Sequence, residues 1–123
     1  MRAADAAEKI TVTRPELLKP HKLELLGLLD EAEQIELRWH LALMAPRLAL
    51  TGPERVRVAA ALQRYLEDRS SIVKTFALQG LADLAGQDPR LRETVRRTLE
   101  QGLRTGTAAM KARTRKLLKE MQN

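Results

Sequence analysis

A repeat of about 37 residues is the feature that most constrains how this chain can fold. Two rows of leucine recur at this interval along the sequence: Leu25, Leu62 and Leu99, and Leu29, Leu66 and Leu103. A less regular row contains His21, Val58 and Val95. Within each copy these positions are four residues apart, which is the spacing of one face of an amphipathic helix. The period predicts similar helical units that bury their apolar faces against one another.

Each copy of the repeat also contains a second apolar row. It begins at an apolar residue followed by a basic one: Leu37-Arg38, Val73-Lys74 and Met110-Lys111. Apolar or small residues mostly follow four, eight and eleven positions later, again on one helical face. Each copy is therefore predicted to be a pair of antiparallel helices, which we call A and B.

Capping residues and prolines set the predicted helix boundaries. Thr13, Thr51 and Asp88 each precede a proline by one or two residues, as expected of helix N-caps. Pro20 predicts a delayed start for its helix, and Pro46 predicts that its helix bends or ends near Ala45. The predicted helices are 2–12, 15–29, 34–50, 53–67, 71–86, 89–104 and 107–121, the first being a B helix without an A partner.

Composition supports an all-α fold in a single domain spanning residues 1–123. Leu and Ala dominate, 31% of the residues are charged, and aromatics make up 2%. The absence of cysteine excludes disulfides and thiolate metal sites, and it agrees with a reducing compartment. We see no apolar run of the roughly 20 residues that a membrane span needs, and no secretion signal, so we expect a cytoplasmic protein.

The segment from Asp68 to Leu84 resembles the HEAT-repeat family. Asp68, Lys74, Ala77, Leu81 and Leu84 occupy positions where that family has its acidic, basic and apolar residues. The other copies depart from the pattern, with Ala32 and Thr105 in place of the acidic residue. The resemblance implies a right-handed α-α superhelix of about three helix pairs plus an N-terminal half repeat. It also implies that the acidic and basic residues join neighbouring repeats.

Catalytic, cofactor and metal sites are not indicated by the sequence. The histidines are His21 and His40, without the spacing of a zinc site. His40 shares a row with Phe76 and Arg113, which predicts a partly exposed position. No Gly-rich phosphate loop or catalytic triad can be assigned, and Gly80, inside a predicted helix, is expected to allow close helix packing. We therefore expect a protein that is not an enzyme and has no cofactor.

A second apolar stripe on the helix predicted over 34–50 contains Trp39, Leu43, Pro46 and Leu50. Packing between neighbouring B helices explains such a stripe, because a B helix in a solenoid touches the B helices on both sides. Tryptophan is also a common anchor in protein interfaces. Trp39, Leu43 and Leu50 are therefore candidate partner-binding residues.

Basic residues form two further candidate sites. Arg38, Lys74 and Lys111 lie at matching positions of successive B helices, where they either join repeats or bind anionic groups. Residues 90–123 carry ten basic and three acidic side chains, a net charge of +7 against +6 for the whole chain. Within this segment Lys111, Arg113, Arg115 and Lys116 form either a polar end-cap of the repeats or an anion-binding surface.

The expected function is that of a non-catalytic scaffold or adaptor that binds another protein on its B-helix face. The candidate partner-binding residues are Trp39, Leu43, Leu50, Arg38, His40, Lys74, Lys111, Arg113, Arg115 and Lys116. The alternative is nucleic-acid binding through residues 90–123, as in the HEAT-like DNA glycosylases that remove alkylated bases. HEAT-like bilin lyases are a third comparison, without a specific residue to support it. We expect a monomer or a weak end-to-end dimer, since the first predicted helix has an alanine-rich face.

Overall fold

The fold is all-helical in the computed structural model, which describes residues 2–122. No strand occurs among these residues. Three short 3₁₀ segments join or extend the helices: Pro15–His21, Ala45–Arg47 and Pro89–Leu91. The α-helices are α1 (Arg2–Thr13), α2 (Lys22–Glu31), α3 (Ile35–Met44), α4 (Gly52–Tyr65), α5 (Ser71–Gln87), α6 (Arg92–Thr105) and α7 (Ala108–Met121).

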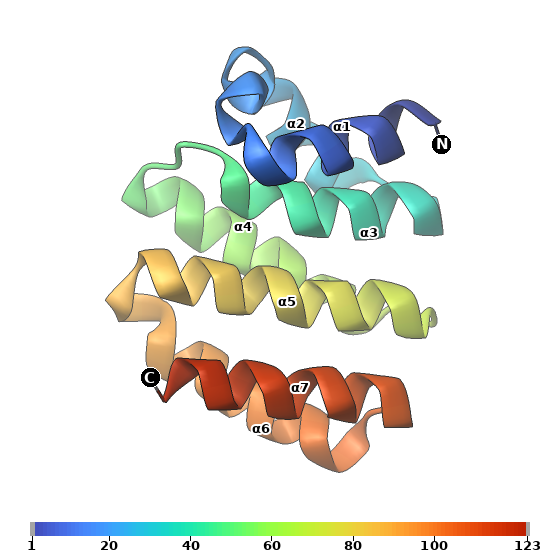
Figure 1. Cartoon of the computed structure of the whole chain (residues 1–123), viewed down its shortest axis with the longest axis vertical. Helices are drawn as coiled ribbons and strands as arrows, with labels where there is room; N and C mark the ends of the chain where they lie inside the picture. The colour runs from blue at the N-terminus through green and yellow to red at the C-terminus, as the bar shows by residue number, and fades with distance from the viewer. Residues whose placement is uncertain (1, 123) are drawn as a thin grey trace.

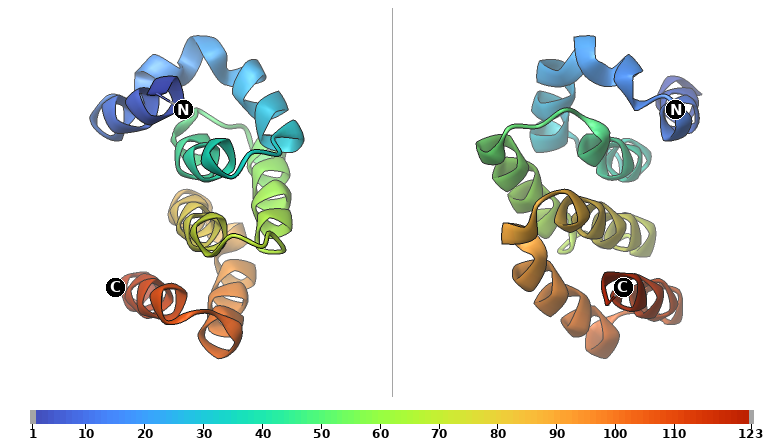
Figure 2. Two further views of the ribbon diagram at one scale, coloured as in Figure 1. Left: turned by 90° about the vertical axis from the view of Figure 1, so that its right-hand side faces the viewer. Right: turned by 60° about the vertical axis from the view of Figure 1, so that its left-hand side comes forward.

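The helices form two layers. The B helices α1, α3, α5 and α7 lie side by side in chain order, and the A helices α2, α4 and α6 lie behind them (Figure 1). Figure 2 shows the same division from the side. Each A helix contacts the B helix that follows it, and α3 and α5 make the most extensive contact between neighbouring B helices. The outward side of α1, α3, α5 and α7, called the B-helix face below, looks toward the viewer in Figure 1.

Two of the three predicted caps, Thr51 and Asp88, are present, and Ser70 and Thr107 are further caps. Thr51 forms a capping box with Glu54, and the side chains of Ser70 and Thr107 accept hydrogen bonds at the starts of α5 and α7. Asp88 caps the 3₁₀ turn before α6. The prediction of a cap at Thr13 is wrong. Thr13 ends α1, and its hydroxyl donates to the Ile10 carbonyl. The next segment begins without a side-chain cap.

The two internal prolines shorten the predicted helices. Pro20 lies in a 3₁₀ segment, and α2 begins only at Lys22. The helix predicted over 34–50 is too long, because α3 ends at Met44 and Pro46 sits in the 3₁₀ turn that follows. Proline has no N–H to donate to the helical ladder, and its ring clashes with the preceding turn. The chain after Pro46 therefore leaves the helix and runs to α4.

The core between the layers consists mainly of medium-sized aliphatic side chains. Leu29, Leu62 and Leu99 from the predicted rows are buried, whereas Leu25 is half-buried at its edge. Gly80 is buried where α5 crosses α3, and a Cβ atom there would lie 2.5 Å from the Ala42 carbonyl oxygen. The prediction that Gly80 allows close packing is confirmed.

Polar contacts join successive helix pairs. The Arg38 guanidinium donates to the Ala32 carbonyl at 2.6 Å and to the Asp68 carboxylate at 2.5 Å. The Tyr65 hydroxyl donates to the Leu29 carbonyl at 2.5 Å. That carbonyl lies in the last turn of α2, where carbonyls lack partners within the helix. None of the helices within residues 2–122 combines the length and apolar character that a membrane crossing requires.

Candidate functional site

Trp39 is part of an aromatic cluster on the B-helix face. Its side chain is half-buried and stacks on His40, with ring centroids 3.6 Å apart. The Phe76 ring of α5 lies 5.2 Å from Trp39 at an angle of 32°. The Arg113 guanidinium of α7 lies over Phe76, 5.5 Å from the ring centroid. Residues of α3, α5 and α7 are thus joined across three adjacent B helices.

Two residues of the predicted Trp39 surface lie in the interior. His40 is 3% exposed, so the prediction of a partly exposed position is wrong. α1 packs on this side of α3, and the Nδ1 of His40 lies 2.5 Å from the Glu36 carbonyl oxygen. Leu50 is 7% exposed and belongs to the core, while Leu43 is half-buried. Trp39 and Leu43 therefore remain available for contact, whereas His40 and Leu50 do not.

The row of basic residues after each B-helix start is not uniform. Arg38 is held by Ala32 and Asp68, and its guanidinium lies over the Tyr65 ring at 5.4 Å. These contacts join the first helix pair to the second, which agrees with the packing interpretation for Arg38. Lys74 and Lys111 are partly exposed, and no ion pair reaches either of them among the described side chains.

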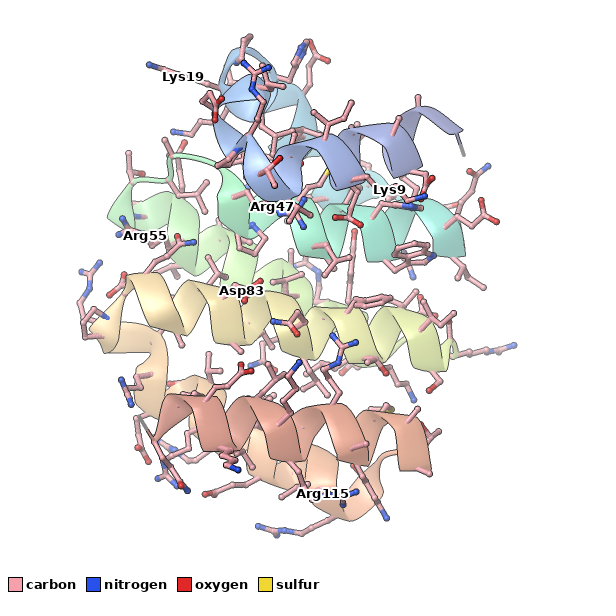
Figure 3. The ribbon with its side chains drawn as sticks, viewed as in Figure 1. Lys9, Lys19, Arg47, Arg55, Asp83 and Arg115 are labelled. Atoms are coloured by element: carbon pink, nitrogen blue, oxygen red, sulfur yellow. The ribbon has the colours of Figure 1, made fainter. Side chains whose placement is uncertain are left out.

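The basic residues of α7 point in different directions. Arg113 is directed toward α5, where it donates to the Gln79 side-chain oxygen at 2.9 Å. Arg115 and Lys116 are exposed, and Figure 3 shows Arg115 on the side of α7 away from α5. The predicted cluster is therefore divided between the B-helix face and the C-terminal end of the stack.

Gln79 connects Arg113 to a carboxylate that the sequence analysis did not single out. The Gln79 amide nitrogen donates to Asp83 at 3.0 Å, while its oxygen accepts from Arg113. Phe76, Gln79 and Asp83 follow one another at spacings of three and four residues, which places them on one side of α5. A strip thus runs along α5 from the aromatic cluster to Asp83, which is labelled in Figure 3.

Two hollows meet at the Asp83 end of this strip. One, of about 640 Å³, lies between α5 and the segment that includes Pro46 and Arg47. The other, of about 320 Å³, lies between α5 and α7 and is also lined by Glu120. Both hollows share Ala82, Asp83 and Gly86. Ala82 has a small side chain and Gly86 has none, so this part of α5 leaves space between the longer side chains around it.

Asp83 is an acidic side chain without an ion-pair partner among the described residues. Water reaches its side chain, yet the neighbouring helices crowd it, and this partial burial raises the pKa of Asp83 against the hydrogen bond from Gln79, which lowers it. Arg47 is nearby but donates to Glu8 at 2.8 Å and to Thr11 at 3.0 Å. Among the described side chains, none forms an ion pair with Asp83.

The strip could be read only in part from the sequence. The repeat places Phe76 in the row of His40, whereas the Phe76 ring contacts Trp39, the residue before His40. Asp83 gave a weak signal: it is an acid four residues after Gln79 in a helix otherwise rich in Leu and Ala. That spacing is typical of many solvated helix faces.

Among residues 2–122 no group of three or more His, Asp or Glu side chains is placed to hold a metal ion. No protein-family model, no curated protein and no solved structure matches this chain. The function must therefore follow from the geometry of its own residues.

Proposed function

We propose that this protein is a short HEAT-like solenoid of about three helix pairs plus an N-terminal half repeat, and that it is a non-catalytic scaffold. Its binding surface is the B-helix face, centred on α5. Stacked helix pairs present extended surfaces of this kind to partner proteins. Fold-level analogy alone does not establish a function, so the proposal depends on the site.

The observation that carries the proposal is the strip on α5. It combines half-buried aromatic rings, hydrogen-bonding side chains and a hollowed end within one helix length. Protein interfaces favour aromatic anchors next to polar groups that fix the register. Figure 1 shows that no other helix of residues 2–122 lies over the outward side of α5.

Two glycine substitutions offer a matched test. A Cβ atom added at Gly86 or at Gly27 would meet open space within 4 Å, so a side chain can leave the helix at either position. Gly86 lines both hollows, whereas Gly27 is in α2, in the other layer. Proteins captured from the native lysate would first be identified with the wild-type chain. The affinity of the purified partner would then be measured for Gly86→Arg and Gly27→Arg.

We expect Gly86→Arg to abolish binding, because its side chain would fill the hollows, and Gly27→Arg to bind as the wild type does. Circular dichroism of both variants would establish that the helices are retained. Equal binding by the two variants would contradict a binding surface on α5.

Nucleic-acid binding by the C-terminal end is the second candidate. The observation in its favour is that Arg115, Lys116 and Lys119 are exposed and have no acidic partner among the described side chains. Phosphate contacts of this kind weaken steeply as salt rises. Retention of DNA or RNA at low salt by the wild type, and its loss in Arg115→Glu/Lys116→Glu, would support this candidate over the first.

A further inference from the structure

The two ends of the α5 strip differ chemically. At one end, Trp39 and Phe76 present half-buried rings. At the other end, Asp83 presents a carboxylate between two hollows. Asp83 lies seven positions after Phe76, a distance of about 10 Å along the helix axis. A partner that covers the strip must therefore offer two different groups at about that separation.

The arginines beside Asp83 are already engaged. Arg47 is held by Glu8 of α1, at 20% and 14% side-chain exposure for the two partners. Arg113 is held by Gln79 and by the face of the Phe76 ring. Moving either arginine to Asp83 would break contacts it already makes. The Asp83 carboxylate therefore has no ion-pair partner among the described side chains, although the charges of Arg47 and Arg113 are near enough to act against the rise of its pKa.

Gln79 also fixes how the Asp83 carboxylate is presented. The amide cannot rotate by half a turn without placing its nitrogen against Arg113 and its oxygen against Asp83, so the two contacts define one orientation. One carboxylate oxygen, Oδ1, accepts from Gln79. The other oxygen has no hydrogen bond from the described residues and can accept one from a partner. Glu120, across the smaller hollow, adds a second negative charge.

We propose that the B-helix face binds an extended peptide segment of another protein, with an aromatic or aliphatic side chain against Trp39 and Phe76 and an arginine or lysine on Asp83. The proposal rests on the proposed function and names the chemistry of its partner. An extended chain in the polyproline-II conformation advances about 3.1 Å per residue with three residues per turn, so side chains three residues apart lie on one face of the partner at about the required separation. The charge at Asp83 selects a basic group, although the chain as a whole has a net charge of +6.

A selection from a random dodecapeptide library on the immobilised full chain tests this proposal. The wild-type protein is expected to enrich peptides in which an arginine or lysine lies about three residues from an aromatic or aliphatic residue. The same selection on Asp83→Lys is expected to enrich an acidic residue at that position instead. Peptides selected on the wild type should bind Asp83→Lys at least about tenfold more weakly.

Glu33→Lys is the matched control, because Glu33 is an exposed acid in the α2–α3 turn and the charge change is the same. This variant is expected to bind the selected peptides as the wild type does. Peptides that bind Asp83→Lys as well as the wild type would overturn the assignment to Asp83, and the proposed function would stand if Gly86→Arg still abolished their binding. Failure to select any peptide, or binding insensitive to Gly86→Arg, would contradict both proposals.

Discussion

The guanidinium of Arg38 and the carboxylate of Asp68 form an ion pair of 2.5 Å between α3 and the turn that precedes α5. The side chain of Asp68 is 8% exposed and that of Arg38 is 29% exposed. Asp68 also accepts a hydrogen bond from the Ser70 N–H at 2.8 Å. Burial acts to raise the pKa of Asp68, but the Ser70 N–H and Arg38 outweigh it and hold the pKa below its usual value. The pair therefore links two successive helix pairs.

Removing the acidic partner should destabilise the stack. Asp68→Ala is expected to lower the free energy of unfolding by about 1.5–3 kcal/mol, the range for hydrogen bonds to charged groups. Urea unfolding followed by circular dichroism measures this change. Asp30→Ala is a useful comparison. Like Asp68, Asp30 forms ion pairs, in its case with Arg57 and Arg64, but its side chain is more exposed. A loss no larger than that of Asp30→Ala would contradict a linking role for Asp68.

Tyr65→Phe should show how much the hydrogen bond to the Leu29 carbonyl contributes to the free energy of unfolding. Deleting the hydroxyl leaves that carbonyl without its partner, and we expect a loss of about 1–2 kcal/mol in unfolding free energy. Burial also raises the pKa of Tyr65 to about 12 from 10.0. Because the folded state disfavours the phenolate, stability should fall as pH rises from 10 towards 12, and Tyr65→Phe should not show this fall.

Glycine-to-alanine substitutions should have opposite effects at two helical positions. At Gly80 the new Cβ would lie 2.5 Å from the Ala42 carbonyl oxygen and 2.9 Å from a Leu62 methyl carbon, so α3 and α5 must move apart. We expect a loss of about 1–3 kcal/mol. At Gly27, which has open space, alanine should raise stability by about 0.5–1 kcal/mol. Thermal unfolding of both variants checks the difference in sign.

Acid should weaken the junction between α5 and α6. The side chain of Asp88 is 4% exposed, and the hydrogen bond from Arg90 holds the pKa of Asp88 at about 2, below its usual 3.8. A lowered pKa means that the folded state favours the carboxylate, so stability is present above pH 3.8 and is lost as pH falls towards 2. Asp88→Asn should lose part of this acid dependence in melts recorded across that range.

Asp83 should behave in the opposite way. Its pKa is raised by partial burial, so the stability it contributes is present below the usual pKa of 3.8 and is lost as pH rises through its folded-state value. Asp83→Asn is therefore expected to melt at the same temperature as the wild type, or slightly higher, at neutral pH. A marked drop in melting temperature would mean that Asp83 supports the fold rather than binding.

The helical pattern could be predicted because the apolar rows, caps and prolines act locally. Thr51 and Asp88 act as caps as their sequence context indicates, and Pro46 ends α3 close to Ala45. His40 was misjudged because its burial depends on α1, which packs on α3 from a distant part of the chain. Neighbouring helices also set the direction of Arg113 and the crowding of Asp83. Repeat spacing contains no information about these contacts.

Carboxyl labelling of the free and partner-bound protein tests the binding face most directly. A water-soluble carbodiimide modifies accessible Asp and Glu side chains, and mass spectrometry locates the modified residues. We predict that a bound partner reduces the labelling of Asp83 while leaving Glu33, in the α2–α3 turn, unchanged. Labelling of Asp83 that is equal in the free and bound states would contradict a partner-binding surface on α5.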